Sequence, residues 1–319
     1  MNTAALQNKK PKQRYATTNW HEYEAALTAR GSLLVWLDKD MKWLAEPTGN
    51  NGRPAKYTDA AIQFCLSIKC LFNLPLRQSL GMVQSLLQFA GLDWPTPDHS
   101  IVCRRQRTLQ VKIGYRRSLG SQHLLVDSTG ILFLGEGEWK RKKHGAEYRR
   151  QWRKVHLGID AETLEIQAIA VTGNGVGDAP MLPELLMQLP ADESIATATL
   201  DGAYDTQGCY AALLERGIMP VIPPRKNAKP WKSKIAGSEV RNAAIAACKR
   251  LGRRIWKRWS CYHRRSLVET KMQCFKRLGS RVMARTFDRQ VAELQVRAVL
   301  LNRFTALGCT KTVPVAEMG

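Results

Sequence analysis

The feature that most constrains the fold is a change in hydrophobic periodicity close to residue 122. From this point, short runs of apolar and β-branched residues alternate with helical segments, which is typical of a sheet covered by helices. The expected strands cover residues 123–126, 154–159, 164–171, 195–200 and 219–222, and the expected helices cover 178–189 and 207–216. This order of elements predicts an α/β domain built on a mixed sheet.

The charge of the chain narrows the class of partner. Its 319 residues include 49 Lys and Arg against 27 Asp and Glu, which gives +22 at pH 7. Such an excess repels itself unless a polyanion neutralises it, and nucleic acid is the commonest polyanion. A membrane surface is the weaker alternative, because it usually binds charge on a short amphipathic helix, whereas here the excess is spread through the chain. No apolar run reaches the length of about 18 residues that a membrane helix needs. The eight cysteines include no C-x-x-C pair, which favours free thiols in a reducing cytoplasm.

Helical periodicity precedes the sheet. Three short helices are expected, from Thr58 or Asp59 to Cys70, from Arg77 to Phe89, and one that Asp98 or Ser100 caps. The third carries Arg104 and Arg105, so the group favours a helix-turn-helix-like DNA reader. An ordinary helical cap on the sheet domain is the alternative. The chain is thus expected to contain a basic disordered arm (1–18), a helical DNA-binding region (19–115), a sheet domain (120–305) and a tail (306–319).

Two stretches of the sheet domain concentrate positive charge. An insertion over residues 225–258 interleaves Lys and Arg with Trp, which suits phosphates and stacked bases. The loop over 139–154 is also basic, and it connects two strands next to Asp127. A solvated surface is the alternative for both stretches, and any single Trp is more often a core residue. Including the third helix, the candidate DNA contacts are Lys140, Arg141, Lys142, Lys143, Arg150, Arg225, Lys226, Trp231, Arg104 and Arg105.

Two aspartates, Asp127 and Asp201, are each expected at the end of an apolar strand. A carboxylate beside a hydrophobic run is costly without a counter-charge, and a metal ion is a natural one. Hard Mg²⁺ binds carboxylate oxygens, and such ions can activate a water or a 3′-hydroxyl for attack on a phosphodiester. The alternative for either residue is a turn or capping role. We expect Asp160 and Asp178 to be turn and cap residues, and Asp205 to cap the helix over 207–216.

The stretch over residues 262–276 predicts one helix with an unusual polar face. At about 100° per residue, one narrow sector holds four polar side chains: Tyr262, Arg265, Glu269 and Lys276. An adjoining apolar stripe would dock the helix on the sheet, and it consists of Val268, Met272 and Phe275. Glu269 would then point at the strand ends. A plain surface pair of Arg265 with Glu269 is the alternative, but it does not explain the tyrosine or the lysine.

The spacing Tyr262-x₂-Arg265-x₃-Glu269-x₆-Lys276 resembles the conserved helix of bacterial insertion-sequence transposases of the DDE type. The segment VDSTG around Asp127 looks like the first aspartate motif of that family, and LDGAYD around Asp201 looks like the second. The segments GRPAKYTDAAI, LPLRQSLG and PDHS are similar to the region that precedes the catalytic domain in the insertion-sequence-five family.

The resemblance implies a ribonuclease-H-like catalytic core and two divalent ions, Mg²⁺ or Mn²⁺, held by Asp127, Asp201 and Glu269. It implies contacts of Tyr262, Arg265 and Lys276 with DNA near the scissile phosphate. The expected partners are double-stranded DNA, namely the terminal inverted repeats and the target, and a second copy in a homodimeric synaptic complex on nucleoid DNA. The rivals are a ribonuclease-H-like nuclease without strand transfer and a catalytically inactive DNA-binding protein or repressor.

Overall fold

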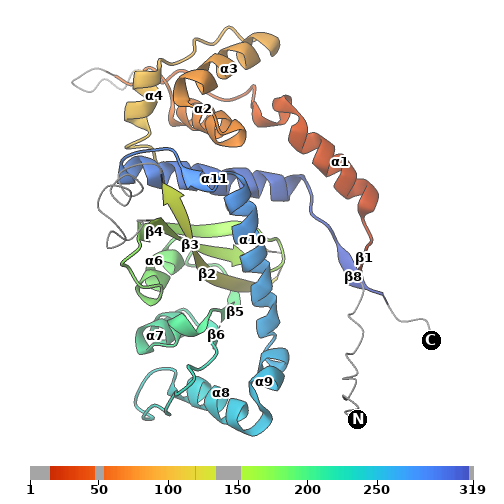
Figure 1. Cartoon of the computed structure of the whole chain (residues 1–319), viewed down its shortest axis with the longest axis vertical. Helices are drawn as coiled ribbons and strands as arrows, with labels where there is room; N and C mark the ends of the chain where they lie inside the picture. The colour runs from red at the N-terminus through yellow and green to blue at the C-terminus, as the bar shows by residue number, and fades with distance from the viewer. Residues whose placement is uncertain (1–14, 47–53, 119, 134–151, 316–319) are drawn as a thin grey trace, which may run out of the picture.

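The computed structural model describes residues 15–46, 54–118, 120–133 and 152–315 of the chain. Figure 1 shows a central sheet, a helical region at one end, further helices at the other end, and an arm that stands off the body. Each part brings different residues to the surface, and the sheet positions the candidate site.

The sheet is mixed, as predicted, and has the order β4-β3-β2-β5-β6. The strands β2, β3 and β4 are antiparallel, whereas β5 and β6 run parallel to β2, and β7 pairs in parallel with the far end of β2. The strands are β2 (Gln122–Phe133), β3 (Trp152–Asp160), β4 (Ile166–Gly173), β5 (Ile195–Thr199), β6 (Met219–Val221) and β7 (Arg281–Val282). The predicted α/β class with a mixed sheet is therefore confirmed.

Helices cover both faces of the sheet. Because side chains alternate along a strand, Leu124 and Val126 pack on one face while Leu125 packs on the other. The first face is covered by α6 (Leu182–Met187) and α7 (Gln207–Glu215), and the second by α10 (Ser266–Arg277) and α11 (Phe287–Leu307). The predicted apolar stripe of Val268, Met272 and Phe275 is buried against the second face.

The helical region contains α2 (Asp59–Phe72), α3 (Leu76–Phe89) and α4 (His99–Arg105). The first two helices meet at 110° across a three-residue turn, in which Asn73 adopts a left-handed conformation. Thr58 caps α2 by accepting a hydrogen bond from the Ala61 N–H, and Asp98 caps α4 in the same way through Ser100. The predicted helices are confirmed, and their turn geometry is that of a helix-turn-helix.

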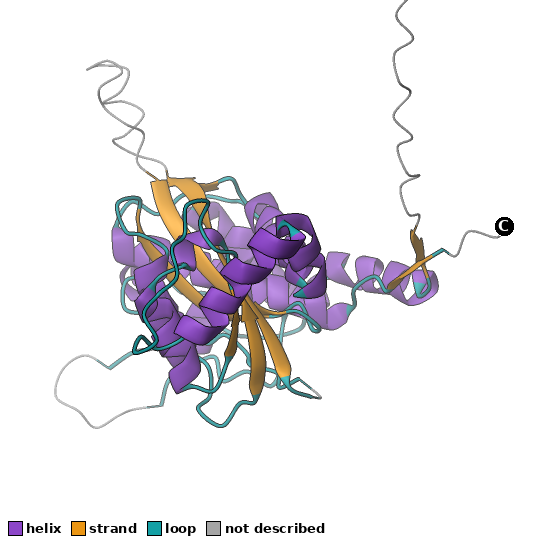
Figure 2. Ribbon diagram, turned by 90° about the horizontal axis from the view of Figure 1, so that it is seen from below, coloured by secondary structure: helices purple, strands orange, loops and turns teal. Residues whose placement is uncertain are grey.

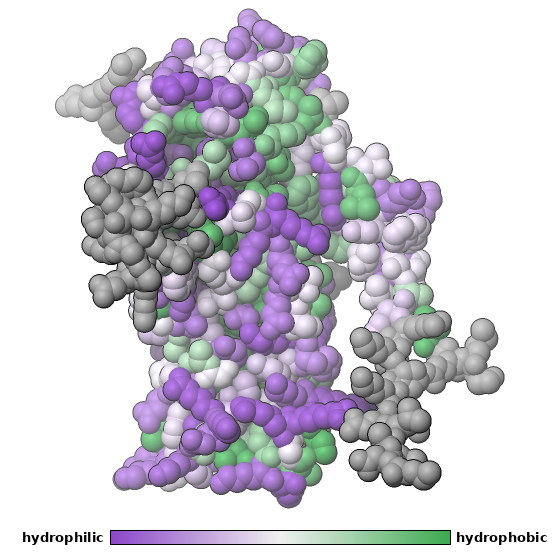
Figure 3. All heavy atoms as spheres, viewed as in Figure 1, coloured by the Kyte–Doolittle hydropathy of each residue, from purple (hydrophilic) through white to green (hydrophobic). Residues whose placement is uncertain are grey.

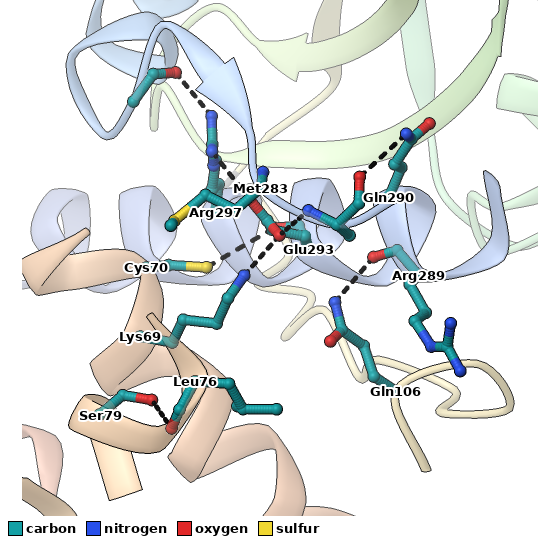
Figure 4. A network of polar contacts seen from close by, with 12 residues as sticks. Lys69, Cys70, Leu76, Ser79, Gln106, Met283, Arg289, Gln290, Glu293 and Arg297 are labelled. Carbon is teal, nitrogen blue, oxygen red and sulfur yellow. Dashed lines mark hydrogen bonds and ion pairs between the residues drawn. The ribbon is translucent and has the colours of Figure 1, made fainter. Parts of the chain in front are cut away.

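The helix α11 joins the helical region to the sheet. Its Val296 and Leu300 belong to the core of the helical region, while its Leu294 and Leu301 belong to the core beneath the sheet. A buried polar network reinforces the junction (Figure 4), because Glu293 of α11 accepts a 2.5 Å hydrogen bond from Lys69 Nζ of α2. The two regions are therefore packed through one shared helix.

The same network holds the connection that follows α10. Glu293 also accepts from the N–H groups of Met283 and Ala284. Arg297, which is 1% exposed, donates to the carbonyls of Gly279 and Arg281 at 2.6 Å each. These contacts fix the path of the chain between α10 and α11, and with it the position of α10 over the sheet.

The arm contains both ends of the described chain. β1 (Tyr15–Thr17) pairs with β8 (Thr312–Pro314) in an antiparallel ribbon that continues into α1 (Trp20–Gly31) and η1 (Leu33–Trp36). Figure 2 shows this ribbon projecting beyond the body. The predicted disorder over residues 1–18 is thus wrong for the residues of β1, because backbone pairing with residues almost 300 positions away orders them. Residues 1–14 lie outside the described residues.

The basic insertion contains two helices, α8 (Ser238–Leu251) and α9 (Arg253–Trp259). They lie at the end of the molecule opposite the helical region (Figure 1). All eight cysteines fall in the described part of the chain and are free thiols. Within that part, no single helix has the length and apolarity to cross a bilayer, and α2 and α3 pass that test only as a pair bent by 110°.

Candidate active site

Asp127 lies in the middle of β2. The prediction that it ends a strand is wrong, because the chain continues to pair with β3 as far as Leu132 opposite Trp152. The side chain is 11% exposed, and its Oδ1 accepts a 2.8 Å hydrogen bond from the Ser128 N–H. Burial raises the pKa of Asp127, and the neighbouring carboxylates of Asp201 and Glu269 raise it further, while Arg265 opposes them. The three acids therefore share one electrostatic environment.

Asp201 follows β5 and lies beside Asp127. The parallel register pairs Leu125 with Thr199, so the same register carried two residues further brings Asp201 next to Asp127. Asp201 caps the short helix η3 (Gly202–Tyr204) by accepting a 2.8 Å hydrogen bond from the Ala203 N–H. The predicted position of Asp201 after an apolar strand is confirmed.

Arg225 supports the turn that follows Asp201. Its guanidinium donates to the carbonyls of Gly202 and Ala203 at 3.2 Å each. We predicted Arg225 as a DNA contact from its place in the basic insertion. The structure gives this side chain an internal role beside the site, although it remains exposed at the surface.

Glu269 comes from α10, on the far side of the site. Arg265 connects it to β2, because Nη1 of Arg265 donates to Glu269 Oε1 at 2.6 Å and Nη2 donates to Asp127 Oδ2 at 2.5 Å. The remaining guanidinium nitrogen, Nε, is buried and has no hydrogen-bond partner. One guanidinium is thus shared by two of the three predicted acids, and it places them on opposite sides of a common centre.

The motif of residues 262–276 does not form a single helix, which corrects the prediction. Tyr262–Arg265 forms the 3-10 helix η4, and α10 begins at Ser266. The left-handed conformation of Cys261 (φ 55°) turns the chain sharply before η4, which separates the motif from α9. Tyr262 is 8% exposed and packs against Trp256 with ring centroids 6.0 Å apart, whereas Lys276 is exposed.

The chemistry of Asp127, Asp201 and Glu269 fits a hard divalent cation, because all three offer carboxylate oxygens. Among the described residues, however, no three acids, histidines or cysteines are grouped closely enough to hold a metal ion. The reason at this site is visible, since the Arg265 guanidinium lies between Asp127 and Glu269 and supplies the positive charge there. The three carboxylates are therefore ligands of the type that the predicted metal binds, and in this structure Arg265 neutralises two of them, Asp127 and Glu269.

A second polar cluster lies on the other face of β2. Asp178 accepts hydrogen bonds from Ser128 Oγ at 2.7 Å and Lys154 Nζ at 3.0 Å. Burial alone would raise the pKa of Asp178, but these two hydrogen bonds lower it overall. Asp178 occupies the N-cap position of the 3-10 helix η2 (Ala179–Met181), as predicted, but its side chain makes no capping hydrogen bond. The competing donors from β2 and β3 explain the difference.

Tyr204 is a site residue that sequence reasoning missed. Its side chain is 0% exposed and its hydroxyl has no hydrogen-bond partner. Burial raises its pKa, and the carboxylates of Asp178, Asp127 and Asp201 add to the effect, so the hydroxyl lies near all three. The only sequence signal is its place in LDGAYD, three residues after Asp201.

The remaining aspartates separate cleanly from the site. Asp160 accepts hydrogen bonds from the N–H groups of Glu162 and Thr163, which confirms the predicted turn. Asp205 does not cap α7, because Thr206 does so through Cys209. Asp205 instead forms a buried ion pair with Arg241, in which Oδ1 and Oδ2 accept from Nε and Nη2 at 2.6 and 3.1 Å.

Two predicted DNA contacts are engaged inside the protein. Trp231 packs against Tyr210 with ring centroids 5.2 Å apart. The guanidinium of Arg241 lies 4.1 Å from the centroid of the Trp231 ring. Arg105 donates to the Tyr57 carbonyl at 3.0 Å and to the Asp59 carboxylate at 2.5 Å. Arg104, Lys226 and Lys276 are exposed. The other candidates, Lys140, Arg141, Lys142, Lys143 and Arg150, lie outside the described residues.

A basic pocket of about 440 Å³ opens beside η4. It is lined by Arg253, Arg254, Lys257, Arg258 and His263. Figure 3 shows hydrophilic side chains gathered over this end of the molecule, which carries α8 and α9. None of the described residues that line the pocket is a carboxylate, so it suits phosphate groups next to the carboxylate site. Its residues were absent from the predicted contacts, although all of them except His263, which lies in η4, belong to the basic insertion.

The site defines a class of protein in which carboxylates from neighbouring strands and a covering helix meet on a mixed sheet. A family model described as "Transposase DDE domain" matches residues 118–303, and a second model with the same description matches residues 28–136. The first match covers more than half of the 319 residues. The chain therefore belongs to the DDE transposase family, and the predicted ribonuclease-H-like class agrees with its sheet order.

Two solved structures that match this chain are only distantly similar to it. The "Drosophila P element transposase strand transfer complex" matches with 16% identity and a TM-score of 0.28, over 53% of this chain and 38% of that chain. The "simian T-cell lymphotropic virus intasome in complex with PP2A regulatory subunit B56 gamma" matches with 13% identity and a TM-score of 0.24, over 57% of this chain and 58% of that chain. The chain thus spans less than two thirds of either protein.

Proposed function

We propose that the chain is a transposase of a bacterial insertion sequence, within the insertion-sequence-five family, that cleaves DNA at the element ends and joins the 3′-hydroxyls to target DNA. The observation that carries this proposal is the sharing of Arg265 between Asp127 of β2 and Glu269 of α10, with Asp201 in the adjacent parallel register. Family membership supports the type of reaction. The motif spacing and the N-terminal segments support the narrower family.

We assign Asp127, Asp201 and Glu269 as the residues that would hold two Mg²⁺ or Mn²⁺ ions. When bound, such ions supply a nucleophile at neutral pH and stabilise charge on the leaving oxygen. The protein contributes a rigid support, because Asp127 is held within a strand and Asp201 caps a turn that Arg225 fastens. Arg265 keeps Asp127 and Glu269 paired with positive charge.

DNA is the proposed substrate, as terminal inverted repeats and as target. The pocket formed by α9 and η4 supports this assignment because it offers five basic side chains beside the carboxylate site. Lys276 and Lys226 extend the exposed basic surface. The 110° turn between α2 and α3 supports end recognition by the helical region, with the exposed Arg104 as a contact. Paired cutting of two ends requires two copies, so we propose a homodimer in the synaptic complex.

The proposal is tested by cleavage and joining of a labelled element end in Mg²⁺. Wild-type protein is compared with Glu269→Gln and with Glu162→Gln, an exposed carboxylate on the turn after β3 that serves as the matched control. We expect Glu269→Gln to bind DNA but to lose both reactions by about a thousandfold or more, since a metal ligand contributes several kcal/mol. The control variant should cut and join as the wild type does.

The rivals give different results in the same assay. A nuclease without strand transfer would cut the ends but would not join pre-cut ends to a target duplex. A repressor or structural factor would bind the ends and cut nothing, whether or not Glu269 is changed. Either result, obtained with folded wild-type protein that binds the element ends, would reject the proposed function.

A further inference from the structure

Two lysines are buried among the residues that the structure describes, Lys69 and Lys271, and only one of them has a carboxylate partner. Lys69 Nζ donates to Glu293 of α11 at 2.5 Å, so its charge is matched inside the protein. Lys271 of α10 is 8% exposed, yet it forms no ion pair with a described carboxylate. Because a buried cation without a counter-charge is costly, Lys271 lacks a partner of the kind that Lys69 has.

The polar contacts of Lys271 leave its ammonium group partly unsatisfied. Nζ donates to Thr305 Oγ1 of α11 at 2.6 Å, and that hydroxyl donates its own proton to the Leu301 carbonyl at 2.8 Å. Glu165 acts on Lys271 from beyond ion-pair distance, and its carboxylate is paired with Arg116 at 3.0 Å. An ammonium group carries further N–H donors, and these remain for whatever occupies the space beside Lys271.

A cavity of about 440 Å³ lies beside Lys271 and is lined by side chains of α1, α10 and α11, the helices that Figure 1 shows around it. Its lining includes three cations, Lys271, Arg30 and Arg277, and none of the described residues that line it is a carboxylate. Arg30 donates to the Phe304 and Gly308 carbonyls, but its buried Nε has no hydrogen-bond partner. The cavity therefore presents unmatched positive charge, which favours an anionic ligand.

Much of the remaining wall of this cavity is apolar. It is formed by Leu164, Leu267, Leu278, Leu301 and Phe304. Leu164, on the turn after β3, has a left-handed backbone conformation with φ 59°, which a bulky residue rarely adopts. Such strain persists where the surrounding contacts fix it, so the leucine is explained by what its side chain contacts. The ligand that fits this wall has an apolar body as well as a negative charge.

We propose that this cavity binds a small amphipathic carboxylate, whose head group pairs with Lys271 and Arg30 and whose hydrocarbon body lies along Leu164 and Phe304. An inorganic anion satisfies the charge but leaves the apolar wall uncovered in a space of about 440 Å³. The bound carboxylate ties α1 to α10, because Arg30 belongs to the first helix and Lys271 to the second. Residues two apart on a helix point about 200° apart, so this ligand lies behind Glu269 and the inference does not depend on the proposed function.

The test measures binding of decanoate to the full-length protein by isothermal titration calorimetry in the absence of DNA. Decanol has the same chain without the charge, and inorganic phosphate has charge without the chain. Lys271→Met removes the charge but keeps an unbranched apolar side chain, and Leu164→Gly removes the apolar wall while relieving the left-handed strain. Lys249→Met is the matched control, because Lys249 is exposed on α8, at the other end of the molecule from α1. Circular dichroism reports the fold of each variant.

We expect wild type and Lys249→Met to bind decanoate alike, and Lys271→Met to bind it about tenfold or more weakly, since the carboxylate then lacks its buried partner. Leu164→Gly should also weaken decanoate binding, because apolar contact is lost. Decanol that binds as tightly as decanoate would overturn the proposal, and so would phosphate that binds as tightly and displaces decanoate. A wild type that binds no decanoate would overturn it too. The wild-type comparison of the three probes decides the matter even if a variant does not fold, and none of these results bears on DNA cleavage.

Discussion

Two aspartate–arginine pairs in the sheet domain use the same chemistry in different surroundings. Asp205 and Arg241 are 0% and 6% exposed, and both carboxylate oxygens accept from the guanidinium. Arg241 also donates to the Lys229 carbonyl, and Asp205 accepts from the Arg225 N–H. This pair is closed, since its donors and acceptors are matched inside the protein.

The pair of Asp127 with Arg265 is open by comparison. Arg265 is 20% exposed, it divides its donors between Asp127 and Glu269, and its Nε has no partner. Glu269 is 53% exposed, so solvent and ions reach this end of the arrangement. The difference teaches that an ion pair stabilises the fold when its polar atoms are all satisfied in burial. When one cation is shared by two acids at the surface, another cation can replace it as the partner of those acids.

The largest expected effect breaks the closed pair. Asp205→Asn should lower the free energy of unfolding by about 3–5 kcal/mol, because it leaves the Arg241 charge buried without a counter-charge. Urea denaturation followed by circular dichroism measures the loss. Asp192→Asn is the control, since Asp192 pairs with Arg117 at the surface with side chains 67% and 61% exposed. We expect the control to lose about 1 kcal/mol or less, and equal losses would refute the contrast.

A second variant removes the arginine of the ion pair at the candidate site. Arg265→Ala removes the cation between Asp127 and Glu269, so Mn²⁺ should bind about tenfold more tightly, a gain of about 1.4 kcal/mol. Isothermal titration of the protein without DNA measures this change. Arg264→Ala is the control, because Arg264 contacts His123 Nδ1 at 3.3 Å and neither acid. Tighter binding by both variants alike would show that general charge, rather than the position of Arg265, controls the metal.

The half-buried His123 extends the comparison to the pH dependence of stability. Burial, aided by Arg264, lowers the pKa of His123 to about 4 from 6.5. The unfolded chain then takes up the proton first, so stability should fall as the pH is lowered from about 6.5 to 4. His123→Gln can keep a hydrogen bond to Thr199, and it should flatten this slope in urea denaturation at several pH values. An unchanged slope would contradict the assignment to His123.

The smallest expected effect concerns two neighbouring arginines of α4, one exposed and one paired with an acid. Arg104 is exposed and Arg105 is paired with Asp59 at 2.5 Å. Arg104→Ala should weaken DNA binding a few-fold and reduce the salt dependence of log K by about 1, as expected for one lost phosphate contact. Arg105→Ala should lower stability by about 1 kcal/mol or less, since the pair is partly exposed. Filter binding over a salt series, with denaturation in parallel, distinguishes the two, and reversed results would exchange their roles.

Local pattern was sufficient for most of the fold. The expected strand over 195–200 is β5 and the expected helix over 207–216 is α7, each within one residue at either end. These elements follow from side-chain periodicity, which depends on neighbours a few positions away. Asp127 shows where that reasoning stops, because Asp-Ser-Thr-Gly has the composition of a turn. Pairing with β3 draws this segment into a strand that continues to Phe133.

The candidate site divides in the same way. Sequence alone selected Asp127, Asp201 and Glu269, because their apolar surroundings and the motif spacing are local properties. It did not distinguish Asp205 as an ion-pair residue, since Arg241 lies 36 positions away. It also did not show that Tyr204 is buried among the acids, because a tyrosine in a turn motif has no local feature that determines its burial.

The sequence by itself determined the types and order of most elements of the sheet domain and pointed to the family, and it supplied the three acids with their motif as a prediction. Only the tertiary structure decided which charges are matched. Arg265 meets Asp127 across 138 positions, and Arg105 turns to Asp59 across 46. Strand and helix patterns are set by the backbone repeat, whereas a charge is neutralised by whatever the folded chain brings within hydrogen-bond distance. The packing of the chain therefore decides which cations are left for DNA.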